Sequence, residues 1–164
     1  MEIQKLNKKF QELWKNIENE KNYQKREKLE ITLSVLKSAG YPYSINCRGD
    51  ACVGDEVLFA RAEFGGSWRS PVFLGWELFE GKIIKDSYGK EKQQHTFTLL
   101  LKNGEKTRIK GRNLYRLICF RKKWKDEEKR NETLKEKHVR GSQARFERQE
   151  RRELEQSSYF GYQF

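Results

Sequence analysis

The sequence predicts an α+β protein: a small five-stranded β-barrel flanked by an N-terminal helix or helical hairpin and by a charged C-terminal helix. Apolar residues first recur every three or four positions, as on one face of a helix. From about residue 55 to residue 120 the apolar period changes to two, in five short runs that follow one another. After residue 120 the pattern is helical again and highly charged. The 164 residues suit one domain with helical extensions.

Residues 2–38 are expected to be helical. The apolar stripe consists of Ile3, Leu6, Phe10, Leu13 and Ile17, and it restarts at Leu29, Leu33 and Leu36 after a polar stretch. This pattern predicts either one long helix or a helical hairpin broken near residues 19–22, packed onto the domain that follows. Gly40 is a suitable stop, because glycine readily adopts the left-handed conformation that ends many helices.

The five expected strands cover residues 55–61, 76–86, 95–102, 105–110 and 115–120. Asn103-Gly104 predicts a tight hairpin between the third and fourth strands, because both residues tolerate positive φ. Gly81 predicts a bend or bulge in the second strand. Residues 63–75, rich in glycine and aromatic residues, are expected to form a long loop in which Trp68 is exposed.

The chain is therefore divided into five segments. They are an N-terminal helical element (1–40), a linker (41–53), the barrel (54–120), a charged helical extension (121–156) and a tail (157–164). The extension has few large apolar residues, which favours a solvated helix or a segment that becomes ordered on RNA or on a partner. Gly141-Ser142 predicts a break in it.

Several short motifs in the central region occur in a familiar order. Gly54-Asp55-Glu56-Val57 opens the first strand, Gly81-Lys82-Ile83-Ile84 continues the second, and Lys102-Asn103-Gly104-Glu105 forms the hairpin. Arg108-Ile109-Lys110 then leads through Asn113-Leu114 into a short turn and the last strand. In these features the region resembles SH3-like small β-barrels of the KOW and Tudor kind. The resemblance implies a binding module without specifying its ligand, and these positions do not supply a methyl-lysine aromatic cage.

The positive charge is concentrated in one segment. The chain has 35 Lys and Arg residues against 24 Asp and Glu residues, a net charge of +11. Residues 82–123 hold 13 basic and 3 acidic residues and so carry +10 of that total. Such a concentration favours an anionic partner, most often a nucleic acid, whose phosphates release counterions when they are neutralised. Solubility alone is the alternative explanation.

The expected nucleic-acid-binding surface follows this basic segment. Lys106, Arg108 and Lys110 alternate along one strand, so they share a face at intervals of roughly 6.5–7 Å, close to the spacing of phosphates along a strand. An edge strand protected from aggregation by lysines is the alternative. The full predicted set is Lys82, Lys85, Lys106, Arg108, Lys110, Arg112, Arg116, Arg121, Lys122 and Lys123. Trp68 and Arg69 are predicted to stack on unpaired bases or to contact a protein partner.

No catalytic site, cofactor or metal site is expected. Phosphate-binding, nucleophile-elbow and H-E-x-x-H motifs do not occur in the sequence. Cys47 and Cys52 lack a histidine at zinc-finger spacing, while Cys119 and His95 are expected to be structural. Neither a membrane-spanning apolar run nor a secretory signal is present. We therefore expect an intracellular protein, cytoplasmic or nucleoid-associated, without a membrane partner.

Together these observations predict a non-enzymatic protein that binds the phosphate backbone of DNA or RNA with low sequence specificity. The alternative is a small protein–protein adaptor or inhibitor, of the kind that phages and mobile elements encode, that binds a nucleic-acid-processing machine. Association with a ribonucleoprotein would combine the two functions.

Overall fold

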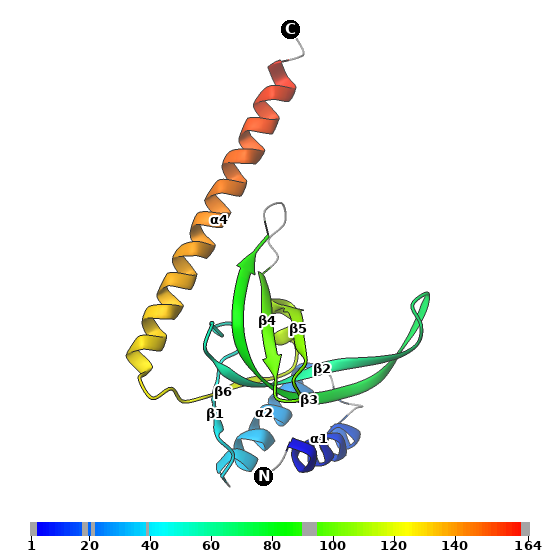
Figure 1. The fold of residues 1–164 in the computed structure, drawn as a ribbon. Helices are drawn as coiled ribbons and strands as arrows, with labels where there is room; N and C mark the ends of the chain where they lie inside the picture. Colours follow the sequence, from blue (N-terminus) through cyan, green and yellow to red (C-terminus); the bar gives the residue numbers. More distant parts are fainter. Residues whose placement is uncertain (1–2, 18–19, 21, 39, 90–94, 162–164) are drawn as a thin grey trace.

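A computed structural model describes residues 3–17, 20, 22–38, 40–89 and 95–161 (Figure 1). Within these residues, four helices accompany one six-stranded antiparallel sheet with the strand order β1-β6-β2-β3-β4-β5, an α+β fold. The elements in chain order are α1 (Ile3–Ile17), α2 (Asn22–Ser38), β1 (Tyr43–Asn46), β2 (Glu56–Ser67), β3 (Ser70–Tyr88), β4 (His95–Leu101), β5 (Lys106–Lys110), α3 (Gly111–Leu114), β6 (Cys119–Lys122) and α4 (Glu127–Gly161).

The sheet is open and has six strands where the sequence predicts five. The additional strand, β1, lies within the expected linker and pairs with β6, so that Asn46 is opposite Phe120. Its four residues are too short to show an alternating pattern. The pairing joins residues more than 70 positions apart in the chain, and local sequence patterns do not reveal contacts of this kind.

Residues 63–75, expected to be a loop, instead continue β2 and β3 as a long hairpin. The pairing runs from Glu63 opposite Gly75 to Ser67 opposite Ser70, with a bulge after Glu63. The hairpin projects from the body of the molecule (Figure 1). Its glycines are typical of loops, which is why the sequence pattern indicates a loop here.

Apolar residues pack on both faces of β2. Leu58 and Ala60 belong to a core that α1 and α2 cover, and Val57 and Phe59 belong to a second core on the opposite face. The predicted helical stripe contributes Leu6, Phe10, Ile17, Leu29 and Leu33 to the first core, whereas the side chain of Leu36 lies outside the described part of the chain. The second core is made mainly by Ile83, Phe97, Leu99, Leu101 and Leu114. Successive residues of β2 therefore alternate between two cores, and both of its faces are buried.

The N-terminal helices cover one face and one edge of the sheet. The predicted break near residues 19–22 is confirmed, since α1 ends at Ile17 and α2 begins at Asn22; residues 19 and 21 lie outside the described part. The Asn7 side chain donates a hydrogen bond to the Leu78 carbonyl (3.1 Å) and accepts one from the Leu78 N–H (2.7 Å). Gln11 donates to the Trp76 carbonyl. Because β4 pairs with β3 only from Gly81 onward, α1 occupies the edge that β4 leaves open.

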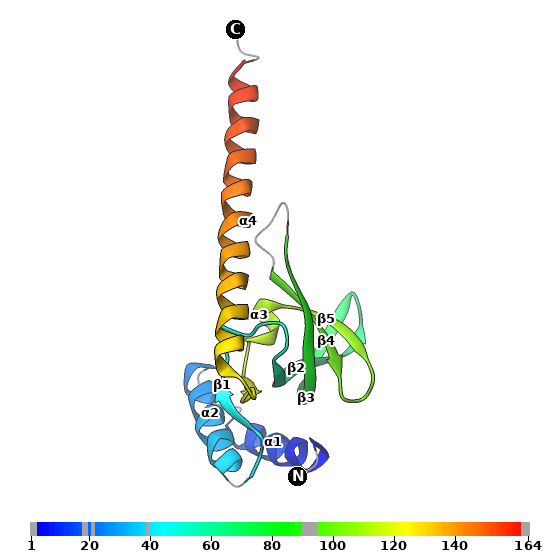
Figure 2. The same cartoon turned by 60° about the vertical axis from the view of Figure 1, so that its left-hand side comes forward.

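Helix α4 is continuous from Glu127 to Gly161, beyond the predicted end at residue 156 and without the predicted break at Gly141-Ser142. Its first half lies beside the sheet and its second half projects away from the body (Figures 1 and 2). A Cβ atom at Gly141 would lie 2.9 Å from the Tyr88 hydroxyl oxygen, so this glycine allows a close approach to β3. None of the described helices is both long enough and apolar enough to cross a membrane.

Polar contacts, in place of an apolar stripe, attach α4 to the sheet. Its buried residues are Arg130, Lys137, Gly141 and Arg148, at intervals of seven, four and seven. Lys137 donates to the Ala51 carbonyl, Arg140 pairs with Asp86 (2.9 Å), and Arg148 donates to the Gly89 carbonyl (3.0 Å). The first half of α4 is therefore packed and not solvated, because its cations find buried acceptors that are distant in sequence.

Asp55 makes the central contact of this attachment. Its carboxylate is fully buried and accepts hydrogen bonds from Arg130 Nε and Nη2 (2.8 and 2.9 Å) and from Trp124 Nε1 (2.7 Å). The Cys52 N–H donates to the same group (3.0 Å). Burial alone would lower the pKa of Arg130, but the hydrogen bonds and charge of Asp55 raise that pKa above its usual value. Arg130 therefore stays charged although it is shielded from water.

We predict that Asp55→Asn lowers the free energy of unfolding by about 3–5 kcal/mol, because it leaves the buried Arg130 without a counterion. Urea unfolding followed by circular dichroism measures the change. The control is Lys102→Ala, which breaks the pair of Glu80 with a lysine whose side chain is 60% exposed. Lys102→Ala should lower the free energy of unfolding by less than about 1 kcal/mol. Similar losses in the two variants would contradict the role assigned to Asp55.

Gly141→Ala should also destabilise the protein, by about 1–3 kcal/mol, because the new methyl group meets the Tyr88 ring. In an unhindered helix the same change stabilises by about 1 kcal/mol, so the sign of the effect reports the contact. Gly161→Ala is the matched control, since no atom lies within 4 Å of a Cβ built there. Thermal unfolding of both variants tests this; a higher melting temperature for Gly141→Ala would refute the close contact.

Candidate functional site

The strand register places five of the predicted basic residues on one face of β3, β4 and β5. Directly opposite residues of an antiparallel pair point to the same side of the sheet. The register forms three rows across the strands: Lys82–Leu100–Lys106, Lys85–Thr98–Arg108 and Ser87–Thr96–Lys110. Two columns of cations thus flank the middle strand β4, which contributes neutral residues only. We call this surface, made of Lys82, Lys85, Lys106, Arg108 and Lys110, the cationic face.

A groove runs along this face between the two columns. The groove has a volume of about 590 Å³ and is lined by Ile84, Lys85, Ser87, Thr98, Lys106 and Arg108. No carboxylate is among these residues. The columns are two strand spacings apart, roughly 10 Å, and neighbouring cations along β5 are roughly 6.5–7 Å apart. The groove can therefore accept an extended polyanion between two rows of positive charge.

The cations of this face are available to a ligand. Lys82, Lys85, Lys106 and Arg108 are exposed, and Lys110 is half-buried. Among the described residues, none of the five takes part in an ion pair. The acidic residues nearest in sequence are engaged elsewhere: Asp86 pairs with Arg140, and Glu105 lies 4.0 Å from Arg61. One carboxylate does lie near this face: Glu56 is opposite Lys82 in the β2–β3 register and pairs with Lys122. The other four cations, on β3 and β5, have no carboxylate partner among the described residues.

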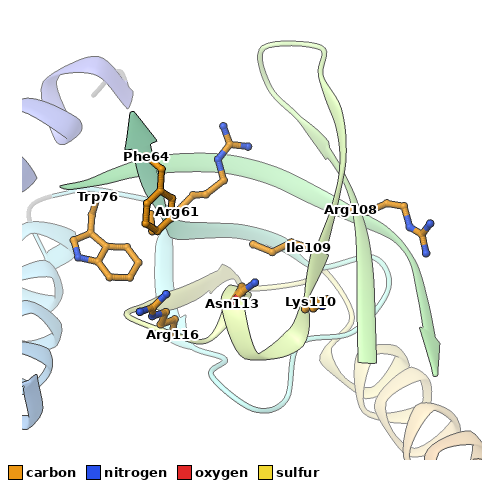
Figure 3. A pocket seen from close by; sticks show the side chains of 9 residues that line it. Arg61, Phe64, Trp76, Arg108, Ile109, Lys110, Asn113 and Arg116 are labelled. Atoms are coloured by element: carbon orange, nitrogen blue, oxygen red, sulfur yellow. The ribbon is translucent and has the colours of Figure 1, made fainter. Parts of the chain in front are cut away.

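A second hollow, which we call the edge pocket, lies where β5 and α3 approach the β2–β3 hairpin (Figure 3). Its volume is about 340 Å³. Figure 3 shows Phe64 and Trp76 on one side, Ile109 across from them, and Arg108 pointing away from the pocket centre. Arg108 also lines the groove, so the two hollows are adjacent. The lining residues are Arg61, Ala62, Phe64, Trp76, Arg108, Ile109, Lys110, Asn113 and Arg116.

The two aromatic residues of the edge pocket have different surroundings. Trp76 is 7% exposed, and its ring is covered by the Arg116 guanidinium, 5.5 Å from the ring centroid, and by Trp14 at 6.0 Å. It therefore forms a wall of the pocket. Phe64 is 57% exposed and meets Phe73 edge-on at 5.8 Å. Of these two rings, Phe64 is the one available to a ligand.

Other predicted residues lie away from the cationic face. Arg121 is 7% exposed and pairs with Glu127 (3.1 Å), because its side chain meets the start of α4; it is a structural residue and not a surface cation. Lys122 pairs with Glu56 (2.9 Å). Lys123 is exposed beside a further hollow that Lys82, Lys125 and Lys129 also line. Arg112 is exposed on α3 and lines no hollow described here.

Trp68 and Arg69 form the turn at the tip of the hairpin. Trp68 is 87% exposed, as predicted, and the Arg69 guanidinium lies 5.6 Å from its ring centroid. Neither residue lines the groove or the edge pocket. The pocket instead uses Arg61, Phe64 and Asn113, which the sequence did not single out. No local motif marks them, because only the pairing of β2 with β3 and the position of α3 bring them together.

The cysteines and His95 belong to the interior. Cys47, Cys52 and Cys119 are buried and free, with 3.3 Å between the Sγ atoms of Cys47 and Cys119. Within the described part of the chain, no group of three His, Cys, Asp or Glu residues could hold a metal ion. His95 stacks on Tyr88 (4.7 Å between centroids) and contacts Phe97. Burial, helped by the charge of Lys137, lowers the pKa of His95 to about 4, so it is neutral at physiological pH.

Comparisons with known proteins match the part of the chain that holds the sheet. The profile of a domain of unknown function (DUF7699) matches residues 47–124, which contain β2 to β6. A curated relative, zinc finger CCCH domain-containing protein 62 of Oryza sativa subsp. japonica, is 40% identical over 139 residues, covering 74% of this chain. The chain spans only 20% of the length of that relative. No solved structure matches.

The lowered pKa of His95 predicts a pH-dependent stability. Unfolded His95 binds a proton below about pH 6.5 and folded His95 only below about pH 4, so stability attributable to this residue falls as the pH drops through that interval. Between pH 7.5 and pH 5 the loss should be about 1–2 kcal/mol. His95→Phe keeps a ring between Tyr88 and Phe97 and should remove this loss. Urea unfolding at both pH values tests the prediction; an identical pH dependence in the two proteins would contradict it.

Proposed function

We propose that this protein binds nucleic acid without catalysing a reaction, and that the cationic face contacts the phosphate backbone of DNA or RNA. The observation that carries the proposal is the arrangement of five cations in two columns beside a groove that no carboxylate lines. Cations at regular intervals, of which only Lys82 has a carboxylate opposite it, favour a ligand with regularly spaced negative charges. A small anion would need only one or two of them.

The geometry supports binding with low sequence specificity. Lysine and arginine side chains that neutralise phosphates release counterions, and phosphates carry no direct sequence information. Each phosphate contact contributes about 0.7 to 0.9 to the slope of the logarithm of affinity against the logarithm of salt concentration. Among the described residues, no Asn, Gln, Asp or Glu side chain lines the groove, so the residues that pair most specifically with adenine or cytosine are missing there. We therefore infer that affinity is general and strongly salt-dependent.

We also propose that the central region is an SH3-like module, to which β1 adds one strand. The succession β2-β3-β4-β5-α3-β6, with β6 returning beside β2, supports this resemblance. The edge pocket supports it as well, because residues of β2 and of β5 line the same hollow. In such a module the sheet provides the surface and the flanking helices hold its shape.

Zinc is not part of the proposal. The name of the rice relative refers to a zinc finger CCCH domain, but the match covers a fifth of that protein. The three cysteines of this chain are buried, and the described residues contain no group suited to a metal ion. We propose that binding here depends on the sheet surface alone and needs no cofactor.

A protein–protein adaptor is the second candidate function, and the outer part of the β2–β3 hairpin, residues 63–75, favours it. Several large apolar side chains there are exposed: Phe64, Trp68, Val72, Phe73 and Leu74. Aromatic residues exposed together are typical of sites that contact a protein partner. In this case, binding to generic nucleic acid should be weak at both about 50 and about 200 mM salt, and a stoichiometric protein partner should co-purify.

Reversing two charges of the groove tests the main proposal. Lys85→Glu combined with Lys106→Glu changes one exposed cation of each column and leaves the edge pocket intact. Affinity for generic DNA and RNA at about 50 mM salt should fall at least tenfold, roughly equally for all sequences, and the salt slope should fall by about 2. Fluorescence anisotropy titrations at several salt concentrations measure both quantities.

The matched control changes the net charge by the same amount elsewhere. Lys9 and Lys15 are exposed on α1 and line neither the groove nor the edge pocket. Lys9→Glu combined with Lys15→Glu should lower affinity much less than the groove variant. Equal losses in the two double variants would show that net charge alone drives binding. Unchanged affinity in the groove variant would reject the cationic face.

A further inference from the structure

The edge pocket combines features that the cationic face lacks. Its volume of about 340 Å³ lies at the lower end of the range for small-ligand pockets. A hollow of this size suits a single nucleotide and is too small for a helical segment of duplex. It also has an aromatic wall, whereas the groove is lined by aliphatic, hydroxyl and cationic side chains.

Phe64 offers a stacking surface at the mouth of the pocket. The ring is more than half exposed, and its contact with Phe73 is edge-on, with an angle of 62° between the ring planes. Unpaired bases stack on exposed aromatic rings regardless of their identity, because every base has a π face. Trp76 and Ile109 supply the apolar surface behind this position.

The charged lining selects an anionic ligand. Arg61, Lys110 and Arg116 line the pocket together with Arg108, and no carboxylate does. Arg61 is partly engaged by Glu63, at 3.3 Å, whereas Lys110 and Arg116 have no ion-pair partner among the described residues. A positively charged ligand such as a modified lysine would be repelled. A planar ring that carries a phosphate fits both the aromatic wall and the cations.

Asn113 adds a polar group that can contact a base edge. Its side chain is exposed at the pocket, and no hydrogen bond to it occurs among the described residues. A carboxamide both donates and accepts, so it can pair with the Watson–Crick edge of a base that is not paired already. In a duplex that edge is occupied, and exposing it requires unstacking and unpairing at a cost of a few kcal/mol.

From these features we propose that the edge pocket holds one unpaired nucleotide of a nucleic-acid strand, with its base on Phe64 and its phosphate near Lys110 and Arg116. The inference rests on the proposed function, because Arg108 joins the pocket to the groove and a strand bound along the groove reaches the pocket. The preferred ligand is accordingly single-stranded.

Fluorescence anisotropy with two probes tests the inference: labelled oligo(dT) of about 15 nucleotides, and the same strand annealed to oligo(dA). Phe64→Ala should lower affinity for the single strand about 5- to 100-fold and change affinity for the duplex less than about twofold. Asn113→Ala, a second exposed position, should lower single-strand affinity about 3- to 10-fold. Val72→Ala, exposed on the same hairpin but outside the pocket, is the control and should have no effect.

The outcomes separate the two proposals. If the Lys85→Glu, Lys106→Glu variant binds both probes like the unmodified protein, the cationic face is rejected. Suppose instead that this variant binds both probes more weakly. If the folded Phe64→Ala and Asn113→Ala variants then bind the single strand normally, or lose affinity for the single strand and the duplex equally, only the pocket assignment is overturned. Thymidine monophosphate is the third probe and should bind at least tenfold more weakly than the oligonucleotide. Equal affinity would overturn the assignment to a nucleotide within a strand.

Discussion

The buried carboxylate of Asp55 is the constraint on which the arrangement of the sheet and α4 depends. A charge without access to water is tolerated only when its partners replace the lost hydration, and Arg130, Trp124 and the Cys52 N–H do so. The backbone of Asp55 also accepts a hydrogen bond from the Ile83 N–H, which ties the carboxylate to β3. The same contacts fix the segment between β6 and α4. Lys123, in this segment, consequently lines the same hollow as Lys82.

The fold places the buried carboxylates and the exposed cations of the sheet on different sides. Asp55 and Asp86 face α4, where Arg130 and Arg140 neutralise them. The cations of β3 and β5 point to the opposite side of the sheet, away from these carboxylates. Strand β3 illustrates the division along a single element: Trp76 and Leu78 are buried near α1, whereas Lys82 and Lys85 are exposed farther along. The five cations of the cationic face therefore stay at the surface, whereas Arg121, in the same basic segment, is buried against Glu127.

Local patterns predicted the features that depend on neighbours in the chain. These include the break between α1 and α2, the alternation in β4 and β5, and the hairpin around Asn103-Gly104, although of these two residues only Gly104 takes a positive φ, of 90°. They also placed Lys106, Arg108 and Lys110 on one face. Features that depend on distant partners could not be predicted in this way. Strand β1 forms by pairing with β6, and Arg130 is buried against Asp55, which lies 75 positions earlier in the chain. The edge pocket likewise depends on the register of the β2–β3 hairpin. The charge pattern predicted that α4 is solvated or becomes ordered on RNA or on a partner. The acceptors of its cations lie far away in sequence, so the pattern does not reveal that its first half packs on the sheet.

Helix α1 covers the edge of β3 that β4 leaves open. Asn7 and Gln11 satisfy backbone groups of Leu78 and Trp76 that no neighbouring strand reaches. The segment matched by the domain profile, residues 47–124, includes this edge but not the helices that cover it. Isolated from α1 and α2, that segment would present an unpaired strand next to the bare apolar surface of Leu58 and Ala60, a template for edge-to-edge polymerisation. The N-terminal helices thus shield this edge and the apolar surface beside it, although they lie outside the residues that the domain profile matches.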